Sequence, residues 1–432
     1  MRHGKIIAAL SAAALALAGL AGCGSGEPTT PSTDAPVDGP SGQLEIFSWW
    51  TAGSEANGLE ALVGVLGEKY PNIEFVNNGA ATGGGSGKDV LQTRMAGGQP
   101  PDSFQVHAGA EAQDYITAGQ LQDVSNLYDE FGLNNAFPQD LVDLLTKDGK
   151  IYTIPSNVHR SNVIWADVKA LEKAGLSTTD AYYDSMESFI AALETAKAAG
   201  FEAPLSMGMT WTQVHLLETV LMADLTPVQY NGLFDGTTDW TGAEVKKALE
   251  DFGKLMSYTN ADRDSLDWEE ALAIALDQKA VFNVMGDWVP GALDARNLVD
   301  GTDYLWAPSP GTDGVYGFLA DSFGLTTGGP NPDAGKAWLD VISSADGQTA
   351  FNKVKGSIPA RTDIDLSSFS DYQQSASKSF KNDVIVGSIQ HGAAATIAQG
   401  NAVNAAVSKF TTSPMAEANL ATLQAELAAA FA

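Results

Sequence analysis

A scattered set of planar, polar and charged side chains stands at the expected ends of helices and strands. A pyranose ring offers apolar C–H faces that stack on aromatic rings, and hydroxyls that both donate and accept hydrogen bonds. Carboxylate, amide, imidazole and ammonium groups bind such hydroxyls through directed, mostly charge-assisted hydrogen bonds. The set is therefore suited to a neutral sugar, and its members are Trp49, Trp50, Glu55, Gln105, His107, Trp268, Asp287, Trp288, Asp321, Lys355 and His391.

Other kinds of site lack their motifs. The glycine-rich run at residues 83–89 resembles a phosphate-binding loop, but Thr82 replaces the first glycine and Asp89 replaces the magnesium-binding Ser or Thr. We interpret this run as an ordinary loop. There is no G-x-S-x-G motif and no HExxH motif, so only long-range convergence could build a zinc site. We predict no catalytic residue, metal ligand or cofactor, and the widely spaced histidines are His3, His107, His159, His215 and His391.

The two carboxylates Glu55 and Asp321 support a rival hypothesis. Glycoside hydrolysis needs two carboxyl groups at a defined separation across the scissile bond. An extracellular glycoside-acting enzyme is therefore the alternative to a binding protein, although no hydrolase motif accompanies the pair.

The first third of the chain predicts a parallel sheet that positions part of the set. Residues 44–49, 73–76 and 103–106 have strand patterns, and apolar residues at i, i+3, i+4 and i+7 from Leu59 predict a helix from Glu55 to the Tyr70–Pro71 stop. A short helix is expected at residues 90–95. Ligands of open α/β sheets bind beyond the carboxyl ends of the strands, which here carry Trp49, Trp50, Gln105 and His107.

The later chain continues the alternation of strands and helices. A segment at residues 308–311 (PSPG) is interpreted as a crossing between lobes. Strands are expected at residues 151–154 and 280–284, and helices at residues 186–199, 212–223, 243–256, 268–277 and 415–432.

The N-terminal segment predicts export and lipid anchoring. Arg2 and Lys5 precede an apolar stretch that is too short to span a bilayer, and it ends in Leu20-Ala21-Gly22-Cys23. This resembles the lipobox of bacterial lipoproteins, with residues 1–22 as signal peptide and Cys23, the only cysteine, as lipid anchor. Residues 23–42 are rich in Gly, Ser, Thr and Pro and are expected to form a flexible linker.

Composition limits the function classes. A hydrophobic content of 44% is typical of a globular chain, and the residues after the linker suffice for two lobes. The formal charge of the whole chain is −29, and removal of the two basic residues of the signal makes it −31. Such a charge argues against nucleic acid as a partner and against anionic ligands.

Several motifs in order resemble one family. Together they resemble the solute-binding proteins of bacterial sugar ABC importers (extracellular solute-binding family 1), most closely the glucose/galactose/mannose-binding subgroup. The resemblance covers nearly the whole chain after the linker. Its motifs are FSWW at 47–50, PDSFQVH at 101–107, VHRSNV at 158–163, FNVMGDW at 282–288, APSPG at 307–311, DSFG at 321–324, KGSI at 355–358, and VGS at 386–388 with His391.

The resemblance implies an α/β, two-lobed periplasmic-binding-protein-like fold, with open α/β sheets in each lobe and a ligand cleft between them. We expect residues 43–158 with 311–355 to form the first lobe, and residues 159–310 with 356–432 the second. By motif, the ligand-binding residues are Trp49, Trp50, Glu55, Gln105, His107, Trp268, Trp288, Asp321, Lys355 and His391.

The implied protein is a monomeric receptor, not an enzyme. It binds a monosaccharide (glucose, or else galactose or mannose) outside the cytoplasm and delivers it to the permease subunits of an ABC importer, while lipidated Cys23 holds it at the membrane. A disaccharide or another solute is the alternative ligand for the same fold.

Structural roles compete with some of these assignments. One tryptophan of the Trp49–Trp50 pair could pack in the core, and Glu55 could only complement a helix dipole. Asp321 and Lys355 could pair with each other, and Asp287 could brace Trp288. His159 and Arg160 fit a lobe crossing better than a sugar contact.

Overall fold

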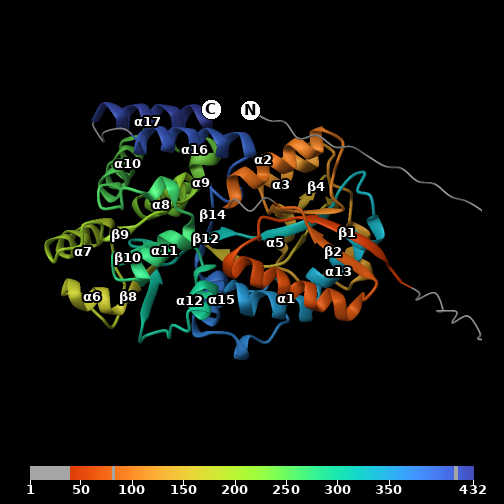
Figure 1. The fold of residues 1–432 in the computed structure, drawn as a ribbon. Coiled ribbons are helices and arrows are strands. Elements are labelled where there is room, and N and C mark those ends of the chain that lie inside the picture. The colour runs from red at the N-terminus through yellow and green to blue at the C-terminus, as the bar shows by residue number, and fades with distance from the viewer. Residues whose placement is uncertain (1–38, 80–82, 413–416) are drawn as a thin grey trace, which may run out of the picture. The chain divides into compact units, whose positions relative to one another are not determined.

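The computed structural model describes residues 39–79, 83–412 and 417–432 (Figure 1). The predicted signal peptide, Cys23 and linker residues 23–38 lie outside the described residues. The first element among the described residues is strand β1 (Gly42–Phe47). Within the described ranges, no helix is both long and apolar enough to cross a membrane.

The first lobe is built on a five-stranded sheet in the order β2-β1-β3-β13-β6. Strands β2, β1 and β3 are parallel, as predicted, but β13 and β6 extend the sheet in antiparallel pairing. The predicted parallel arrangement of the first three strands is therefore confirmed, and the sequence did not predict that β13, more than 200 residues later, adds an antiparallel strand that pairs Asp321 with His107. The added strands are β2 (Ile73–Asn77), β3 (Ser103–His107), β6 (Ile154–Pro155) and β13 (Asp321–Leu325).

The helices of the first lobe mostly follow the predicted pattern. Helix α1 (Gly53–Lys69) buries Leu59, Leu62 and Leu66, the residues of its apolar stripe. It packs against α14 (Ala345–Lys355) and α13 (Pro332–Ser343). The predicted strand at 151–154 is divided between β6 and a hairpin, and the remaining elements are α3 (Ala110–Thr117), α4 (Ser125–Glu130), α5 (Gln139–Leu144), β4 (Thr146–Lys147) and β5 (Lys150–Ile151).

The glycine-rich run is not a loop. It forms the first turns of helix α2 (Gly83–Ala96), so our interpretation of residues 83–89 is wrong. Glycine costs about 1 kcal/mol relative to alanine inside a helix. Tertiary contacts offset this cost, because Leu91 is buried and Lys88 forms an ion pair with Glu111 of α3.

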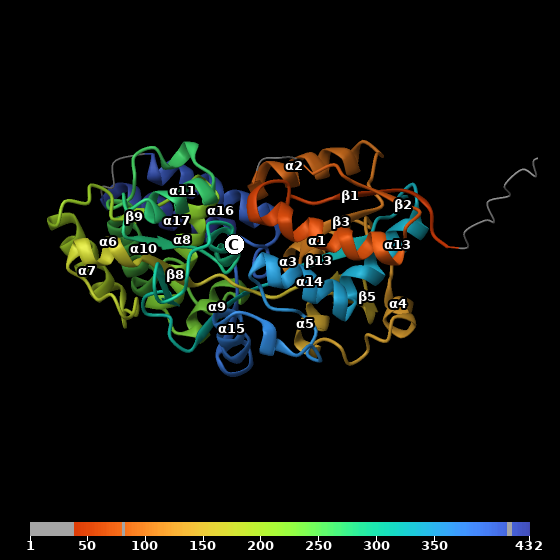
Figure 2. The same cartoon turned by 60° about the horizontal axis from the view of Figure 1, so that its bottom comes forward.

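The second lobe is built on a four-stranded sheet in the order β11-β8-β10-β9, surrounded by helices (Figures 1 and 2). The helices expected at 186–199, 212–223, 243–256 and 268–277 are confirmed to within two residues, and helix α8 is buried along residues 212–222. The strands are β8 (Val163–Asp167), β9 (Leu205–Ser206), β10 (Phe282–Val284) and β11 (Tyr304–Pro308), and the helices are α6 (Val168–Ala174), α7 (Met186–Ala198), α8 (Thr210–Asp224), α9 (Pro227–Asp235), α10 (Ala243–Met256), α11 (Trp268–Leu276), α16 (Ile397–Thr411) and α17 (Glu417–Ala430).

A three-stranded sheet stands where the chain passes between the lobes. Its order is β14 (Val384–Gly387), β12 (Val315–Leu319) and β7 (His159–Arg160). Only Ala320 separates β12 from β13, so the chain passes directly from this sheet into the first lobe. Helix α15 (Asp371–Asn382) lies between the helices of the two lobes in both views (Figures 1 and 2), and helix α12 (Val289–Ala295) lies beside it in Figure 1.

Candidate functional site

One cavity of about 250 Å³ is lined by residues of both lobes. All of the predicted ligand-binding residues except Gln105 line it. The structure therefore brings together side chains that are up to 342 positions apart in the sequence, from Trp49 to His391. Sequence reasoning did not select several other lining residues, among them Lys88, Glu111, His159 and Trp211.

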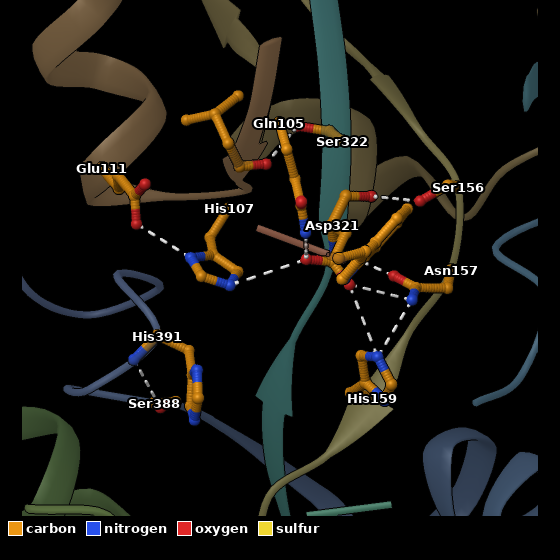
Figure 3. Close-up of polar contacts among 12 residues, drawn as sticks. Gln105, His107, Glu111, Ser156, Asn157, His159, Asp321, Ser322, Ser388 and His391 are labelled. Atoms are coloured by element: carbon orange, nitrogen blue, oxygen red, sulfur yellow. Dashed lines mark hydrogen bonds and ion pairs between the residues drawn. The ribbon is translucent and has the colours of Figure 1, made fainter. Parts of the chain in front are cut away.

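Asp321 is the best-satisfied polar group of the first-lobe wall. Its carboxylate accepts hydrogen bonds from Gln105 Nε2 at 2.7 Å and Asn157 Nδ2 at 2.9 Å. His159 Nε2 lies 3.4 Å from Oδ2, and His107 Nε2 lies 3.6 Å from Oδ1 (Figure 3). Burial by itself would raise the pKa of Asp321, but the hydrogen bond from His159 and the charges of His107 and Lys355 lower it below the usual range. Asp321 is thus held ionised.

Gln105 lies behind Asp321 instead of on the cavity wall. Its side chain is buried, and its Oε1 accepts a hydrogen bond from Ser48 Oγ at 2.6 Å while its Nε2 donates to Asp321. Gln105 and His107 alternate along β3 onto one face, as predicted, but only His107 reaches the cavity. From these contacts we infer that Gln105 orients Asp321.

Glu55 and Lys355 form the ion pair of this wall. Lys355 Nζ donates to Glu55 Oε1 at 2.6 Å, and the Lys355 side chain is 1% exposed. Burial raises the pKa of Glu55, and the charge of Lys355 opposes this shift. Among the described residues no ion pair joins Lys355 to Asp321, so that alternative pairing is not made. Lys355 ends helix α14 at Gly356, which has a φ of +95° and leaves no room for a Cβ against the Asp287 carbonyl.

A second charged cluster joins His107, Glu111 and Lys88. Glu111 Oε2 lies 2.8 Å from His107 Nδ1 and 2.6 Å from Lys88 Nζ. Burial would raise the pKa of Glu111, but Lys88 and His107 lower it to about 2. The ring centroids of Trp49 and His107 lie 5.0 Å apart. Lys88 Nζ lies 5.3 Å from the centroid of the Trp49 ring. The sequence shows the four-residue spacing of His107 and Glu111. It gave no reason to select Lys88, because residues 83–89 were interpreted as a loop and not as part of helix α2.

The two tandem tryptophans differ in their packing. Trp50 is 1% exposed and packs against Phe351 and Phe323, with ring centroids 4.6 and 5.7 Å away. Trp49 is 8% exposed and faces His107. Of the pair, Trp49 therefore presents more of its surface to a ligand.

The second-lobe wall is aromatic and centres on Trp288. The Trp288 ring lies 6.3 Å from Trp211, 6.5 Å from Trp268 and 5.1 Å from His391, measured between centroids. Trp211 lies in the first turn of helix α8 and is absent from the predicted set, because an isolated tryptophan near a helix start carries no distinguishing pattern. This wall can cover an apolar sugar face.

His159 and Asp287 brace the junction between the walls. Asp287 Oδ1 is hydrogen-bonded to His159 Nδ1, and Oδ2 accepts from the Arg160 amide at 3.0 Å. Burial lowers the pKa of His159, but the charge and hydrogen bond of Asp287 raise it above the usual value. Asp287 is fully buried and braces His159 and the Arg160 amide, whereas its role as a brace for Trp288 stays a prediction.

Two polar residues of helix α8 hold the loop that carries His391. Glu218 accepts hydrogen bonds from the amides of Ile389 and Gln390 at 2.7 and 3.0 Å. His215 Nδ1 lies 3.3 Å from His391 Nε2. His215, Glu218 and His391 form a group whose ligand atoms lie within 4.8 Å of one another, so three residues predicted to bind no metal could hold one.

Burial also dominates the protonation of this group. It lowers the pKa of His215 to about 4 and that of His391 well below the usual value, where the charge of His107 adds to the effect. It raises the pKa of Glu218 to about 7, although the hydrogen bonds from residues 388–390 oppose the shift. Both histidines are therefore neutral near pH 7.

Comparisons with known proteins identify the relatives of this chain. A family model described as bacterial extracellular solute-binding protein matches residues 52–349. An uncharacterized ABC transporter extracellular-binding protein of Pyrococcus horikoshii is 34% identical over 86% of this chain and 84% of its own length. A probable sugar-binding periplasmic protein of Mesorhizobium japonicum is 30% identical over 85% of this chain and 88% of its own length.

Comparison with a solved structure shows which fold this chain shares. A chitin oligosaccharide binding protein superposes with a TM-score of 0.77 at 20% identity, over 90% of this chain and 99% of that one. At this identity the likeness concerns the fold alone. It confirms the predicted two-lobed α/β architecture.

Proposed function

Because the chain belongs to the family of bacterial extracellular solute-binding proteins, we propose that it is the sugar receptor of an ABC importer and that it binds one monosaccharide, glucose in the first place, or else galactose or mannose. The family consists of binding proteins of ABC transporters and not of enzymes, so the hypothesis of a glycoside-acting enzyme is set aside. The proposal concerns the ligand and the way in which the protein delivers it.

The observation that carries the proposal is the chemistry of the two cavity walls. The first-lobe wall offers hydroxyl partners that already have hydrogen-bond or ion-pair partners in the protein, such as Asp321, His107 and Lys355. The second-lobe wall offers aromatic faces. This combination matches a neutral ring with one apolar face and a polar rim.

The size of the cavity supports a monosaccharide. Pockets for drug-sized ligands have volumes of roughly 300–1,000 Å³, and this cavity of about 250 Å³ lies below that range. A disaccharide would need the lobes to stand further apart. We therefore rank a single pyranose before longer ligands.

Calorimetric titration of the purified protein with glucose, galactose and mannose tests the proposal. We expect stoichiometric binding of at least one of them, with loss of at least about 100-fold in affinity for Trp49→Ala and for His391→Ala, because each removes a partner of the ligand. Trp306→Ala is the matched control, since Trp306 pairs with Tyr372 away from the cavity. Failure to bind any monosaccharide or short oligosaccharide would contradict the proposal.

In this proposal, sugar binding changes how the two lobes are arranged relative to each other. We assign residues 43–158 with 311–355 to one lobe and residues 159–310 with 356–432 to the other. A ligand that contacts both walls shifts the population toward a closed form, which the permease then recognises. Small-angle scattering with and without the sugar that binds should detect a more compact molecule when it is bound.

Lipid anchoring of Cys23 completes the proposal. A diacylated cysteine supplies two acyl chains, enough for stable attachment, and the anchor raises the effective concentration of the receptor beside the permease. Cys23→Ala should leave sugar binding in solution unchanged but reduce uptake by cells. Unchanged uptake together with continued attachment to membranes would refute the role of Cys23.

A further inference from the structure

The imidazole of His215 has a defined tautomer. His215 lies on α8 with no exposed surface, and its Nε2 is 2.9 Å from the carbonyl oxygen of Ser161. A carbonyl oxygen can only accept a hydrogen bond, so Nε2 must carry the proton. Because a neutral imidazole carries only one N–H, Nδ1 of His215 has a free lone pair.

This lone pair determines the tautomer of His391. His391 Nε2 lies 3.3 Å from His215 Nδ1, within hydrogen-bond distance. Two lone pairs at this distance would repel each other, so Nε2 of His391 must carry the proton and donate it. Nδ1 of His391 is then an acceptor. Among the described residues it has no protein partner, and the His391 side chain lines the cavity.

Helix α8 also holds the backbone of this loop. Glu218, one turn after His215, accepts hydrogen bonds from Ser388 Oγ at 2.9 Å and from the Ile389 and Gln390 amides. The His391 amide donates to Ser388 Oγ at 3.1 Å (Figure 3). One face of α8 therefore fixes both the position of the loop and the hydrogen-bonding state of the ring.

The same atoms allow a second interpretation, a metal bound by His215, Glu218 and His391. Glu218 Oε1 lies 3.7 Å from His215 Nδ1. However, Glu218 Oε1 already accepts a hydrogen bond from Ser388 Oγ and Oε2 accepts one from the Ile389 amide, so a metal would have to compete with the Ser388 hydroxyl for Oε1. The contacts therefore favour the hydrogen-bonded relay over a metal site.

We propose that His215 is a positioning residue that makes His391 a hydrogen-bond acceptor toward the ligand, so that the sugar must present a hydroxyl to His391 Nδ1. The inference rests on the proposed function for its ligand, but the tautomers do not depend on it. It identifies a specificity requirement: replacing that hydroxyl by hydrogen, fluorine or a methoxy group removes the donor.

Nitrogen-15 NMR of the imidazoles in the sugar-free, full-length protein tests the relay directly. We expect His215 and His391 both to be protonated at Nε2 and bare at Nδ1 at pH 7. Protonation of His391 at Nδ1 would overturn the inference. If the tautomers are as expected and no sugar binds, the proposed function fails while the positioning of His391 stands.

Two substitutions at His215 test its effect on binding. His215→Asn keeps an acceptor oxygen near the place of Nδ1, whereas His215→Leu has a similar volume and no acceptor. We expect His215→Leu to weaken sugar binding by about tenfold or more and to change the tautomer of His391, with a much smaller effect for His215→Asn. Equal affinity of His215→Leu and the wild type would overturn the inference. Thermal unfolding establishes that each variant folds.

Sugar analogues give a readout that needs no substitution at the buried position. In the wild type, the deoxy and deoxyfluoro analogues at one hydroxyl should lose similar affinity, because fluorine cannot donate. That loss should disappear in His391→Leu. Retention of affinity by the fluoro analogue at the coupled position would mean that His391 donates, and it would overturn the inference. So would stoichiometric Zn²⁺ binding that requires His215 and displaces the sugar.

Discussion

The cavity has two walls of different chemistry. The first-lobe wall holds charges in closely paired groups, such as Glu55 with Lys355 and Glu111 with Lys88, each pair at 2.6 Å. The second-lobe wall is formed by tryptophans and by the neutral His391, and the neutral, buried His215 lies behind His391. Paired charges offer strong hydrogen bonds without a net field that would attract ions, and the aromatic wall excludes water from them.

The same difference determines how each wall responds to substitution and to pH. On the first wall neighbouring charges stabilise the ionised forms of Asp321 and Glu111, and beside the second wall burial favours the neutral form of Glu218. The following tests separate the walls, in order of the expected effect.

Lys355→Met should give the largest change in stability. It leaves the Glu55 carboxylate without its ion-pair partner, and breaking a buried pair in this way costs about 3–5 kcal/mol. We expect a decrease of this size in the free energy of unfolding, measured with urea, and recovery of most of it in Lys355→Met/Glu55→Gln. The control is Lys409→Met, which breaks an exposed pair with Glu426 and should cost at most about 1 kcal/mol.

Glu111→Gln should remove an acid-sensitive part of the stability. The pKa of Glu111 falls from 4.5 to about 2 on folding, so the stabilisation is present above pH 4.5 and is lost as the pH decreases toward 2. Up to about 3 kcal/mol is expected from a shift of this size. The stability difference between wild type and variant should therefore shrink over that range. A difference that does not change with pH would contradict the paired-charge description.

Glu218→Gln should show the opposite pH dependence. The pKa of Glu218 rises to about 7 on folding, so the wild type loses stability as the pH increases from 4.5 to about 7, while the unfolded chain ionises first. The neutral glutamine avoids this loss. Relative to wild type, the variant should gain up to about 3 kcal/mol across this range, as measured by urea unfolding at several pH values. If the variant gains no stability relative to wild type, the hydrogen-bond donors of the loop already stabilise the charged form of Glu218.

Glu269→Gln should have the smallest effect and should act on the contact between the lobes. Glu269 of α11 accepts a hydrogen bond from the Ser54 amide at 3.0 Å, at the N-terminus of α1, which has no side-chain cap of its own. Losing this charge at a helix N-terminus costs about 0.3–1 kcal/mol, so sugar affinity should decrease by about two- to fivefold. Glu270→Gln is the neighbouring control, because Glu270 caps its own helix.

Local patterns in the chain predicted the elements well and the contacts only in part. Helix α10 (Ala243–Met256) has the predicted bounds, because its apolar stripe and its ends are local features. The glycine-rich run was misinterpreted, since the contacts of Lys88 and Leu91 that stabilise α2 come from elsewhere in the fold. Strand β13 could not be placed, because nothing in its own residues says that it pairs with β3.

The sequence by itself determined the residue types of the site and the ends of the elements that carry them, since propensity and periodicity act over a few residues. Only the tertiary structure decided which residues meet. Lys355 pairs with Glu55 across 300 positions, and His391 reaches His215 across 176. Such contacts are selected by packing and by the need to satisfy buried polar groups. For this reason Gln105 lies behind Asp321. No local pattern in the sequence indicated that His215 and Glu218 of α8 hold the loop of His391.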